Sequence, residues 1–208
     1  MDSAQRRERI LREAAALFAA HGYAGVSMGD VQTAVGGSKG TLYRYFSDKT
    51  DLFRSAVEML IDERNKPLSS FHPNRSDPAE ALREFGRHFA EVVLDPGAIA
   101  LHRLVTAEAE RVEGLGQTFF QHGPAVGYAA LAGYLDSLAE TGAVTIGDSM
   151  LAAVQLYHAM VGALQMRLLV NATDPPTAAE IEASISAAVD TFLSGAGRGG
   201  AGLGAGRK

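Results

Sequence analysis

The feature that most constrains this chain is the spacing of its apolar residues, which recurs every three to four positions along most of its length. Near the amino terminus, Ile10, Ala14 and Phe18 follow this spacing, so their side chains share one face of a helix. Later segments repeat the period, and none shows the strict alternation that is typical of a strand. The pattern predicts an all-α fold of about nine helices.

Glycine, proline and capping residues divide this pattern into individual helices. Gly22 is placed to end the first helix, Ser27 and Asp30 form a capping box for the second, and Ser47 is expected to cap the fourth. Residues 69–78, rich in Ser and Pro, are the expected linker. Further helices are expected at residues 78–94, 97–112, 115–140 with a break at Gly123-Pro124, 148–171, and from a Thr177–Glu180 capping box to Leu193.

These boundaries predict two domains and a tail. Residues 1–66 are expected to form an amino-terminal domain, and residues 67–194 a second helical domain. Residues 195–208 are glycine-rich and cannot bury a core, so we expect a disordered tail. The chain has a net charge of −5, but residues 1–57 hold eight basic and six acidic side chains. A slightly basic module on an acidic body focuses attraction for a polyanion on one face.

Several classes of function lack their sequence signals. The chain has no cysteine, which excludes disulfides and thiolate metal sites. Its histidines show no pair at metal-ligand spacing, and we find no nucleophile elbow, paired-carboxylate signature or cofactor fingerprint. We therefore expect neither an enzyme nor a bound metal or cofactor. The sequence shows no apolar leader and no run of membrane-spanning length, so we expect a cytoplasmic protein.

The segment "VGGSKGTLYRYF", residues 35–46, is the strongest candidate for a functional element. Its glycines do not form a phosphate-binding loop, because the P-loop spacing and a preceding strand are both missing. A short helix, a glycine-containing turn and a second helix are instead typical of a helix-turn-helix. In the second helix, Leu42 and Phe46 share the core-facing side, whereas Gly40 and Arg44 lie close to the opposite side.

The outward ridge of this second helix has side chains suited to DNA. Ser38 is expected to cap the helix, and Thr41 and Tyr43 flank the ridge. An arginine there reaches a phosphate or a guanine edge, and a threonine contacts a thymine methyl group or a phosphate. The alternative is a purely structural role, in which Tyr43 and Tyr45 pack the small domain and Arg44 is a solvated surface residue.

Residues 8–57 resemble the DNA-binding domain of the tetracycline-repressor (TetR/AcrR) family of transcriptional regulators. The resemblance is carried by "LFAAHGY", "VSMGDV" and "GGSKGTLYRYFSDKTDLF", in this order and spacing. It implies a homodimeric repressor whose recognition helices enter the major groove of a near-palindromic double-stranded DNA operator. An apolar or amphipathic small-molecule effector in the second, ligand-binding and dimerisation domain would release the DNA. The alternative is an all-helical interaction or sensor protein that has lost specific DNA binding.

The resemblance also implies roles for individual residues. Ser27 and Met28 stand where the second helix begins against the DNA backbone. On the recognition helix, the tyrosine hydroxyls contact phosphates, whereas Thr41 and Arg44 are the better candidates for reading bases. The implied DNA-binding residues are Ser27, Met28, Ser38, Lys39, Gly40, Thr41, Tyr43, Arg44, Tyr45 and Lys49.

Two residues depart from the family pattern. Family members commonly carry a small residue where Gln32 stands and a valine where Gly37 stands. A buried valine stabilises a fold by roughly 1.5–3 kcal/mol, so Gly37 is expected to loosen the recognition helix. Gly37→Val is therefore expected to raise the melting temperature unless the native φ at this position is positive.

Two segments of the second domain carry apolar seams with steps of three and four residues. Together they suit a four-helix bundle across a two-fold axis, because a helix-turn-helix protein reads two half-sites. The alternative is that both helices pack only inside one subunit. The residues expected at the dimer interface are Val154, Tyr157, Val161, Leu164, Leu168, Ile181, Ile185 and Phe192.

Aromatic side chains of the second domain are candidates for an effector pocket. Rings with a few polar groups suit an apolar or amphipathic small molecule, although each ring is also explained as an ordinary core residue. The residues expected to line this pocket are Phe85, Phe89, His102, Phe119, Phe120, Tyr128 and Tyr157.

Overall fold

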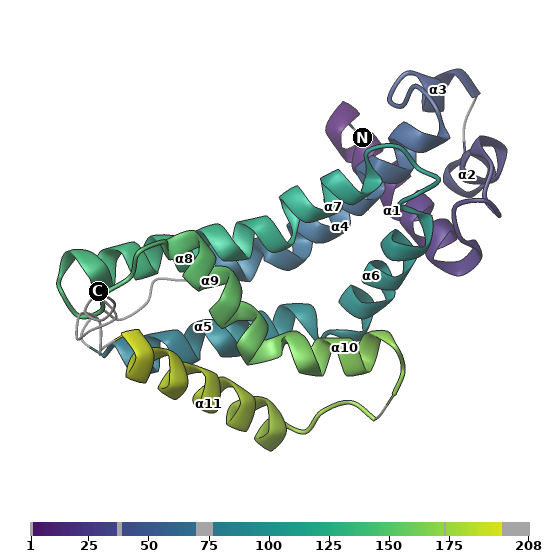
Figure 1. The fold of residues 1–208 in the computed structure, drawn as a ribbon. Helices are drawn as coiled ribbons and strands as arrows, with labels where there is room; N and C mark the ends of the chain where they lie inside the picture. Colours follow the sequence, from purple (N-terminus) through teal and green to yellow (C-terminus); the bar gives the residue numbers. More distant parts are fainter. Residues whose placement is uncertain (1, 37–38, 70–76, 173, 197–208) are drawn as a thin grey trace, which may run out of the picture. The chain divides into compact units, whose positions relative to one another are not determined.

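The computed structural model describes residues 2–36, 39–69, 77–172 and 174–196, and most of these residues are helical (Figure 1). The described residues contain no strand, as the apolar period predicts. Within these ranges no helix is both long and apolar enough to cross a membrane. The helices group into two compact units.

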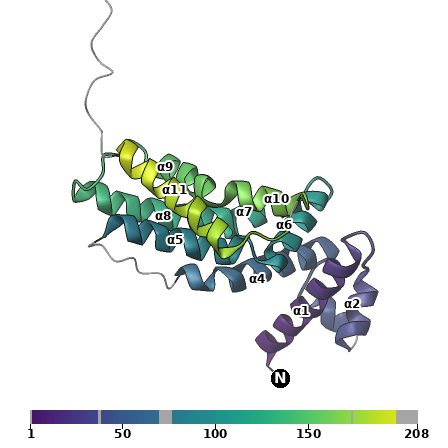
Figure 2. The ribbon, with the colours of Figure 1, turned by 90° about the horizontal axis from the view of Figure 1, so that it is seen from below.

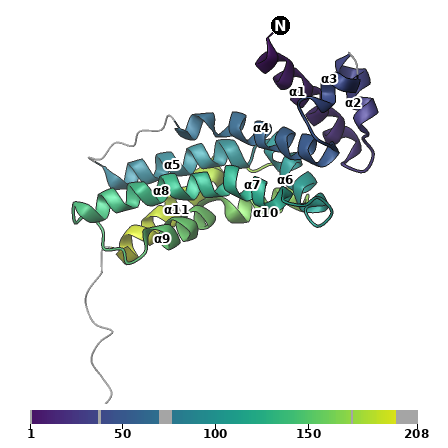
Figure 3. The same cartoon turned by 90° about the horizontal axis from the view of Figure 1, so that it is seen from above.

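The first unit combines residues 1–66 with residues 96–125. Its core joins apolar residues of the first four helices, such as Phe18, Val31 and Phe53, to Leu101 and Leu115 further along the chain. Figure 3 shows α1 with α2 and α3 beside it. The helices of this unit are α1 (Ser3–His21), α2 (Met28–Val35), α3 (Lys39–Tyr43), most of α4 (Lys49–Ser69), α6 (Pro96–Glu108) and α7 (Leu115–His122).

Among the described residues, the second unit combines residues 67–69 and 77–95 with residues 126–172 and 174–196. One π-helical turn, η1 (His158–Gly162), joins α9 to α10, so that residues 149–169 form one continuous helix. The helix α11 packs along α5 and η1 (Figure 2). The other helices of this unit are α5 (Pro78–Val93), most of α8 (Pro124–Glu140), α9 (Ser149–Tyr157), α10 (Ala163–Leu169) and α11 (Ala178–Ala196).

A glycine brings the helices of the second unit close together. A Cβ atom at Gly86 of α5 would lie 2.6 Å from Cγ2 of Ile185 and 2.9 Å from Sδ of Met160. Ile185 and Met160 are both fully buried, so these atoms lie inside the packed core. The missing side chain at Gly86 therefore permits the observed contact of α5 with α11 and η1.

Several predicted helix ends are confirmed. Gly22 follows α1 with φ 70°, and its N–H donates to the carbonyl of Phe18. The capping box of α11 is present, because the Glu180 N–H donates to Thr177 Oγ1 at 3.2 Å and the Thr177 N–H donates to Glu180 Oε2 at 2.8 Å. The expected break in residues 115–140 falls at Gly123, between α7 and α8.

Other predicted ends differ from the structure. The cap of α4 is Asp48 rather than Ser47, because Asp48 Oδ1 accepts the N–H of Asp51 at 2.8 Å. The helix α6 ends at Glu108, four residues early, and α11 continues through Ala196 into the expected tail. The expectations for Gly37, for Ser38 and for tail residues 197–208 lie outside the described residues.

Candidate nucleic-acid interface

The first helix of the candidate motif, α2, is fixed at both ends. The Asp30 N–H donates to Ser27 Oγ at 3.2 Å, and the Ser27 N–H and hydroxyl donate to Asp30 Oδ2 at 2.8 and 2.7 Å. These bonds with Ser27 lower the pKa of Asp30. Gly36 ends the helix with φ 73°, a conformation suited to glycine. Ser27 is exposed and Met28 half-buried, so the start of α2 reaches the surface at the predicted place.

The second helix, α3, and the turn that follows it separate core from surface as the helical period predicts. Leu42 and Phe46 are only 4% and 1% exposed. On the other side Gly40 is exposed, Tyr43 is 53% exposed, and Thr41 is half-buried. The structure therefore brings Gly40, Thr41 and Tyr43 together at one exposed surface over a buried anchor.

The recognition helix is shorter than the sequence predicts. It ends at Tyr43, so Arg44 and Tyr45 lie in the turn that follows instead of on the helix. The Phe46 N–H still donates to the carbonyl of Leu42 at 3.1 Å, and the chain then leaves the helical path before Ser47. This early end places Arg44 at the margin of the α3 surface rather than in its middle.

Tyr45 ties this turn to α1. Its hydroxyl shares a hydrogen bond with Ser3 Oγ at 3.2 Å and accepts one from Arg44 Nη2 at 3.1 Å. The Arg44 guanidinium also lies 5.0 Å from the centre of the Tyr45 ring. The bond with Ser3, and then that from Arg44, lowers the pKa of the Tyr45 phenol. Tyr45 thus orients Arg44, a role that the helical period does not indicate.

Lys49, expected at a phosphate, makes contacts within the chain. Its Nζ donates to the carbonyl of Tyr23 at 3.0 Å and lies 4.1 Å from the centre of that ring. The Tyr23 hydroxyl in turn bonds with Thr50 Oγ1 at 2.9 Å. Lys49 and Thr50 therefore hold the start of α4 against the segment that precedes α2.

Two arginines of α1 also contact the helix-turn-helix motif, and the sequence pattern did not predict these contacts. Arg9 Nη2 donates to the carbonyl of Val35 at 3.0 Å, where a positive charge suits the carboxyl end of α2. The Arg7 guanidinium lies 5.3 Å from the centre of the Phe46 ring. The charged run at residues 2–9 indicates a solvated helix face, but its period does not reveal these partners.

The expected pocket residues are divided between the two units. In the second unit the rings form a packed cluster, with Phe89 and Tyr128 each close to Tyr157, at centroid distances of 5.0 and 5.1 Å. Burial raises the pKa of Tyr157 in this cluster. In the first unit His102 packs on Phe119, with the ring centroids 5.1 Å apart. Burial lowers the pKa of His102. The residues in the second unit are Phe85, Phe89, Tyr128 and Tyr157, and those in the first are His102, Phe119 and Phe120.

The expected dimer seam also serves the core of a single chain. Val161 and Ile185 are fully buried, and Tyr157 and Leu164 are 5% and 6% exposed, within one protomer. These four residues therefore do not lie on a free face of the single chain. Tyr157, Val161 and Ile185 belong to the apolar core of the second unit. Half-buried positions on the same helices are Val154, Leu168, Ile181 and Phe192.

A cavity of about 400 Å³ lies in the first unit, lined by α1, α4 and α6. Phe18 and Phe53 contribute aromatic walls, and small side chains such as Ala56 and Ala100 leave the space open. Arg12, which is ion-paired with Glu8 and Glu63, and Arg64 are the charged residues of this otherwise apolar lining. The volume and lining fall within the range of small-molecule sites.

The capped α2, the turn at Gly36 and the exposed α3 surface define a helix-turn-helix protein. The family model described as bacterial regulatory proteins of the tetR family matches residues 10–56. The model described as the carboxy-terminal domain of AefR-like transcriptional repressors matches residues 80–195, more than half of the chain. The chain belongs to the TetR family of transcriptional regulators.

Individual relatives agree with this assignment. The chain is 30% identical over 110 residues to the HTH-type transcriptional repressor AcnR of Corynebacterium diphtheriae, an alignment covering 53% of this chain and 45% of AcnR. It is 32% identical over 93 residues to the regulator AcrR of Shigella flexneri, covering 43% of this chain and 42% of AcrR. The chain thus spans less than half the length of these two curated relatives.

Solved structures match nearly the whole chain. The flavonoid-responsive regulator FrrA has a TM-score of 0.83 at 28% identity, covering 93% of this chain and 97% of FrrA. A TetR-family regulator from Mesorhizobium loti has a TM-score of 0.76 at 28% identity, and the match covers 93% of this chain and 98% of the M. loti regulator. The two-part helical architecture is therefore shared with TetR-family regulators over their full length.

Proposed function

We propose that this protein is a ligand-responsive repressor of transcription, which binds a near-palindromic operator as a homodimer and is released by a small effector. The observation that carries the proposal is the exposed surface of α3, with Gly40 and Tyr43 outward over buried Leu42 and Phe46. A surface that only packed the small domain would not leave Tyr43 half exposed. The relative AcnR, named as a transcriptional repressor, supports repression as the direction of regulation.

The residues of this surface divide into positioning and reading roles. The hydroxyl of Tyr43 contacts a phosphate, and Gly40 lets the backbone of α3 approach the groove. Arg44, oriented by Tyr45, reads a guanine edge or binds a phosphate at the margin of the surface. The remaining proposed contacts come from Ser27, Met28, Ser38, Lys39 and Thr41, whereas Lys49 is bound to Tyr23 within the chain.

Selection of bound sequences from a random DNA pool tests this function and gives the spacing of the half-sites. Mobility shifts on the selected operator should weaken as salt rises, because binding releases counterions from the DNA. Tyr43→Phe should weaken binding uniformly across sequences. Arg44→Ala should relax specificity at one base position by about 1–3 kcal/mol if it reads that base. Arg103→Ala, which removes an exposed arginine of α6, is the matched control.

Two outcomes would contradict the proposal. Failure of the selection to enrich any sequence would favour the alternative of an interaction or sensor protein. Specific binding that Arg44→Ala and Tyr43→Phe leave unchanged would place the DNA contact elsewhere. A circular-dichroism melting curve for each variant separates loss of contact from loss of fold.

We propose that the dimer forms through the outward faces of α9–α10 and α11. Leu151, Met166 and Val170 are 54%, 58% and 63% exposed in a single chain. The helix α11 likewise exposes small residues, including Ala183 and Ala187, which allow close approach of a second helix. Apolar side chains left exposed on these helices are candidates for burial against a second copy.

We propose that the effector binds in the cavity between α1, α4 and α6. The apolar lining favours an apolar molecule, and Arg12 and Arg64 favour one that carries an acidic or other polar group. A molecule there touches α1 and α4, whose packing positions α2 and α3. The ligand named for FrrA, a flavonoid, belongs to this broad chemical class.

A fluorescent apolar anion, anilinonaphthalene sulfonate, probes this cavity directly. Its saturable fluorescence gain should be lost in Ala100→Phe, where the new ring occupies the cavity. Ala107→Phe adds the same ring at an exposed position of α6 that does not line the cavity, and should bind like the parent. Equal binding by both variants, with loss in Tyr128→Ala, would instead place the effector at the aromatic cluster.

A further inference from the structure

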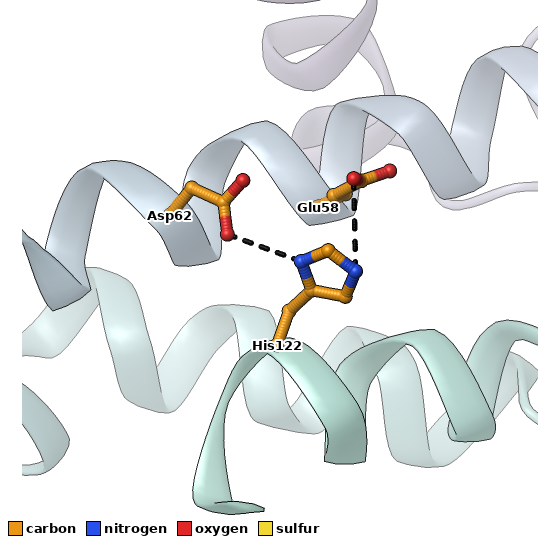
Figure 4. A group of neighbouring side chains, drawn as sticks. All are labelled: Glu58, Asp62 and His122. Carbon is orange, nitrogen blue, oxygen red and sulfur yellow. Dashed lines mark hydrogen bonds and ion pairs between the residues drawn. The ribbon is translucent and has the colours of Figure 1, made fainter. Parts of the chain in front are cut away.

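Three side chains capable of binding a metal meet in the first unit. Glu58 and Asp62 lie one turn apart on α4, and His122 of α7 points between them (Figure 4). Each offers a ligand atom, and the three atoms lie within 4.8 Å of one another. The histidine spacing predicted no metal site, because these ligands come from two helices far apart in the sequence.

The two nitrogens of His122 have different surroundings. Nδ1 lies 3.1 Å from Asp62 Oδ1, a hydrogen-bond distance, whereas Nε2 lies 3.6 Å from Glu58 Oε1. Two ligand atoms on a tetrahedral zinc ion are about 3.4 Å apart, as zinc–nitrogen and zinc–oxygen distances near 2.1 Å require. The gap between Nε2 and Glu58 is therefore too long for a hydrogen bond and suits a shared ion.

The residues around His122 favour an ion shared between its Nε2 atom and Glu58. Asn65 Nδ2 donates to the carbonyl of His122 at 2.6 Å and fixes the end of α7 against α4. Glu58 and Asp62 are like charges at i, i+4, a spacing that destabilises a helix unless a cation reduces the repulsion. The side chains of Glu58, Asp62 and His122 are 45%, 57% and 35% exposed, so an ion can reach them from solvent.

We propose that His122 Nε2 and Glu58 bind a divalent transition-metal ion, with Asp62 accepting the Nδ1 proton and orienting the ring. A carboxylate behind a ligating imidazole is the usual second partner in histidine metal sites. Imidazole with carboxylate favours zinc, nickel or copper over magnesium and calcium, which take oxygen ligands. Water completes the coordination, and the ion links α7 to α4 in the first unit.

Calorimetric titration of the chelator-treated full chain with Zn²⁺ tests the site. We expect one saturable site per chain, and no comparable binding of Mg²⁺. His122→Ala and Glu58→Gln should remove this site. Asp62→Asn should weaken it by about 10–100-fold, the usual effect of losing an orienting partner. His21→Ala, which removes an exposed histidine of α1, should bind Zn²⁺ like the parent.

Thermal unfolding gives a second readout that does not depend on DNA binding. Zn²⁺ should raise the melting temperature of the parent and of His21→Ala, and leave that of His122→Ala unchanged. If His122→Ala fails to fold, Glu58→Gln carries the comparison, because it keeps the shape of the side chain. Absence of a Zn²⁺ site in the parent, or a site equally strong in His122→Ala or Glu58→Gln, would overturn the proposal.

Discussion

Gly36 has φ 73° and ψ 144°, a backbone conformation that is essentially restricted to glycine. A Cβ atom there would meet no other atom within 4 Å, so any cost of a side chain comes from the backbone alone. Gly36→Ala should therefore lower the free energy of unfolding by about 1–3 kcal/mol. Urea unfolding followed by circular dichroism measures the change.

Gly29 of α2 is the matched control for that substitution. A Cβ at Gly29 would lie 3.5 Å from Ser27 Oγ, an ordinary contact, and its φ is not positive. Gly29→Ala should therefore stabilise the helix by up to about 1 kcal/mol through helix propensity. Equal destabilisation by both alanines would show that backbone strain at Gly36 is not the cause.

The capping box of α2 makes a prediction about pH. Ser27→Ala removes the bond to the Asp30 N–H and should cost about 1 kcal/mol. The folded state lowers the pKa of Asp30, so the stabilisation by its carboxylate is present at neutral pH and is lost as the pH falls through that lowered pKa. The stability difference between the parent and Asp30→Asn should therefore stay constant at neutral pH and shrink only as the pH falls below 3.8, the ordinary pKa of this carboxyl. A stability difference that shrinks already between about pH 7 and about pH 5 would contradict this role of Asp30.

Local sequence signals predict the burial of some residues in the candidate interface but not the contacts of others. Leu42 and Phe46 were predictable because four residues separate side chains on one helix face. The contacts of Tyr45 with Ser3 and of Lys49 with Tyr23 were not, because each joins residues more than twenty positions apart. The candidate interface was thus predictable in its residue types, while the side chains that orient it required the tertiary structure.

At the scale of helices, the type of each element followed from its period, and the errors concern its ends. The α4 cap fell on Asp48 instead of Ser47, since neighbouring residues both suit a cap and a one-residue register decides between them. The early end of α3 at Tyr43 has no marker such as glycine or proline in "YRYFSDK". Cap chemistry therefore locates an end reliably only where one candidate residue stands alone.

Packing between helices gives a sharper prediction at Gly86. Alanine favours a helix, but a Cβ at Gly86 would lie within 3.0 Å of both Ile185 and Met160 in the core. Overpacking of this kind costs about 1–3 kcal/mol, so Gly86→Ala should destabilise the protein. Gly133→Ala on α8 meets open space and should be neutral or stabilising. The melting temperatures of the two variants show whether core packing or helix propensity determines the sign of the change in stability.

The seam on α9–α10 and α11 shows what a period cannot decide. The steps of three and four residues correctly grouped Val161 and Leu164 on one face, together with Tyr157. Tyr157 and Val161 are buried in the core of the same chain, because burial depends on which elements are near and not on the pattern itself. An apolar stripe therefore predicts that a face is buried without identifying its partner.

At the scale of the whole molecule, the grouping of helices into units was the least predictable feature. Residues 96–125 pack with residues 1–66, although the sequence separates them by the helix α5. The same grouping brings His122 to Glu58 and creates the cavity lined by α1, α4 and α6. The proposed metal site and the proposed effector cavity thus both depend on contacts between residues far apart in the sequence, which no local sequence pattern predicts.

The proposed dimer provides the last prediction, because operator binding by a two-fold protein depends on it. A charge at Ala187 of α11, exposed in one chain, would be buried and unpaired between two copies. Ala187→Glu should therefore shift the mass measured by light scattering from twice 21.9 kDa toward a single chain. Ala130→Glu, at an exposed position of α8, is the control and should remain dimeric. If Ala187→Glu stays dimeric and still binds the full operator, the interface lies on another face, whereas a monomer that keeps its melting curve and loses the operator ties dimerisation to DNA binding.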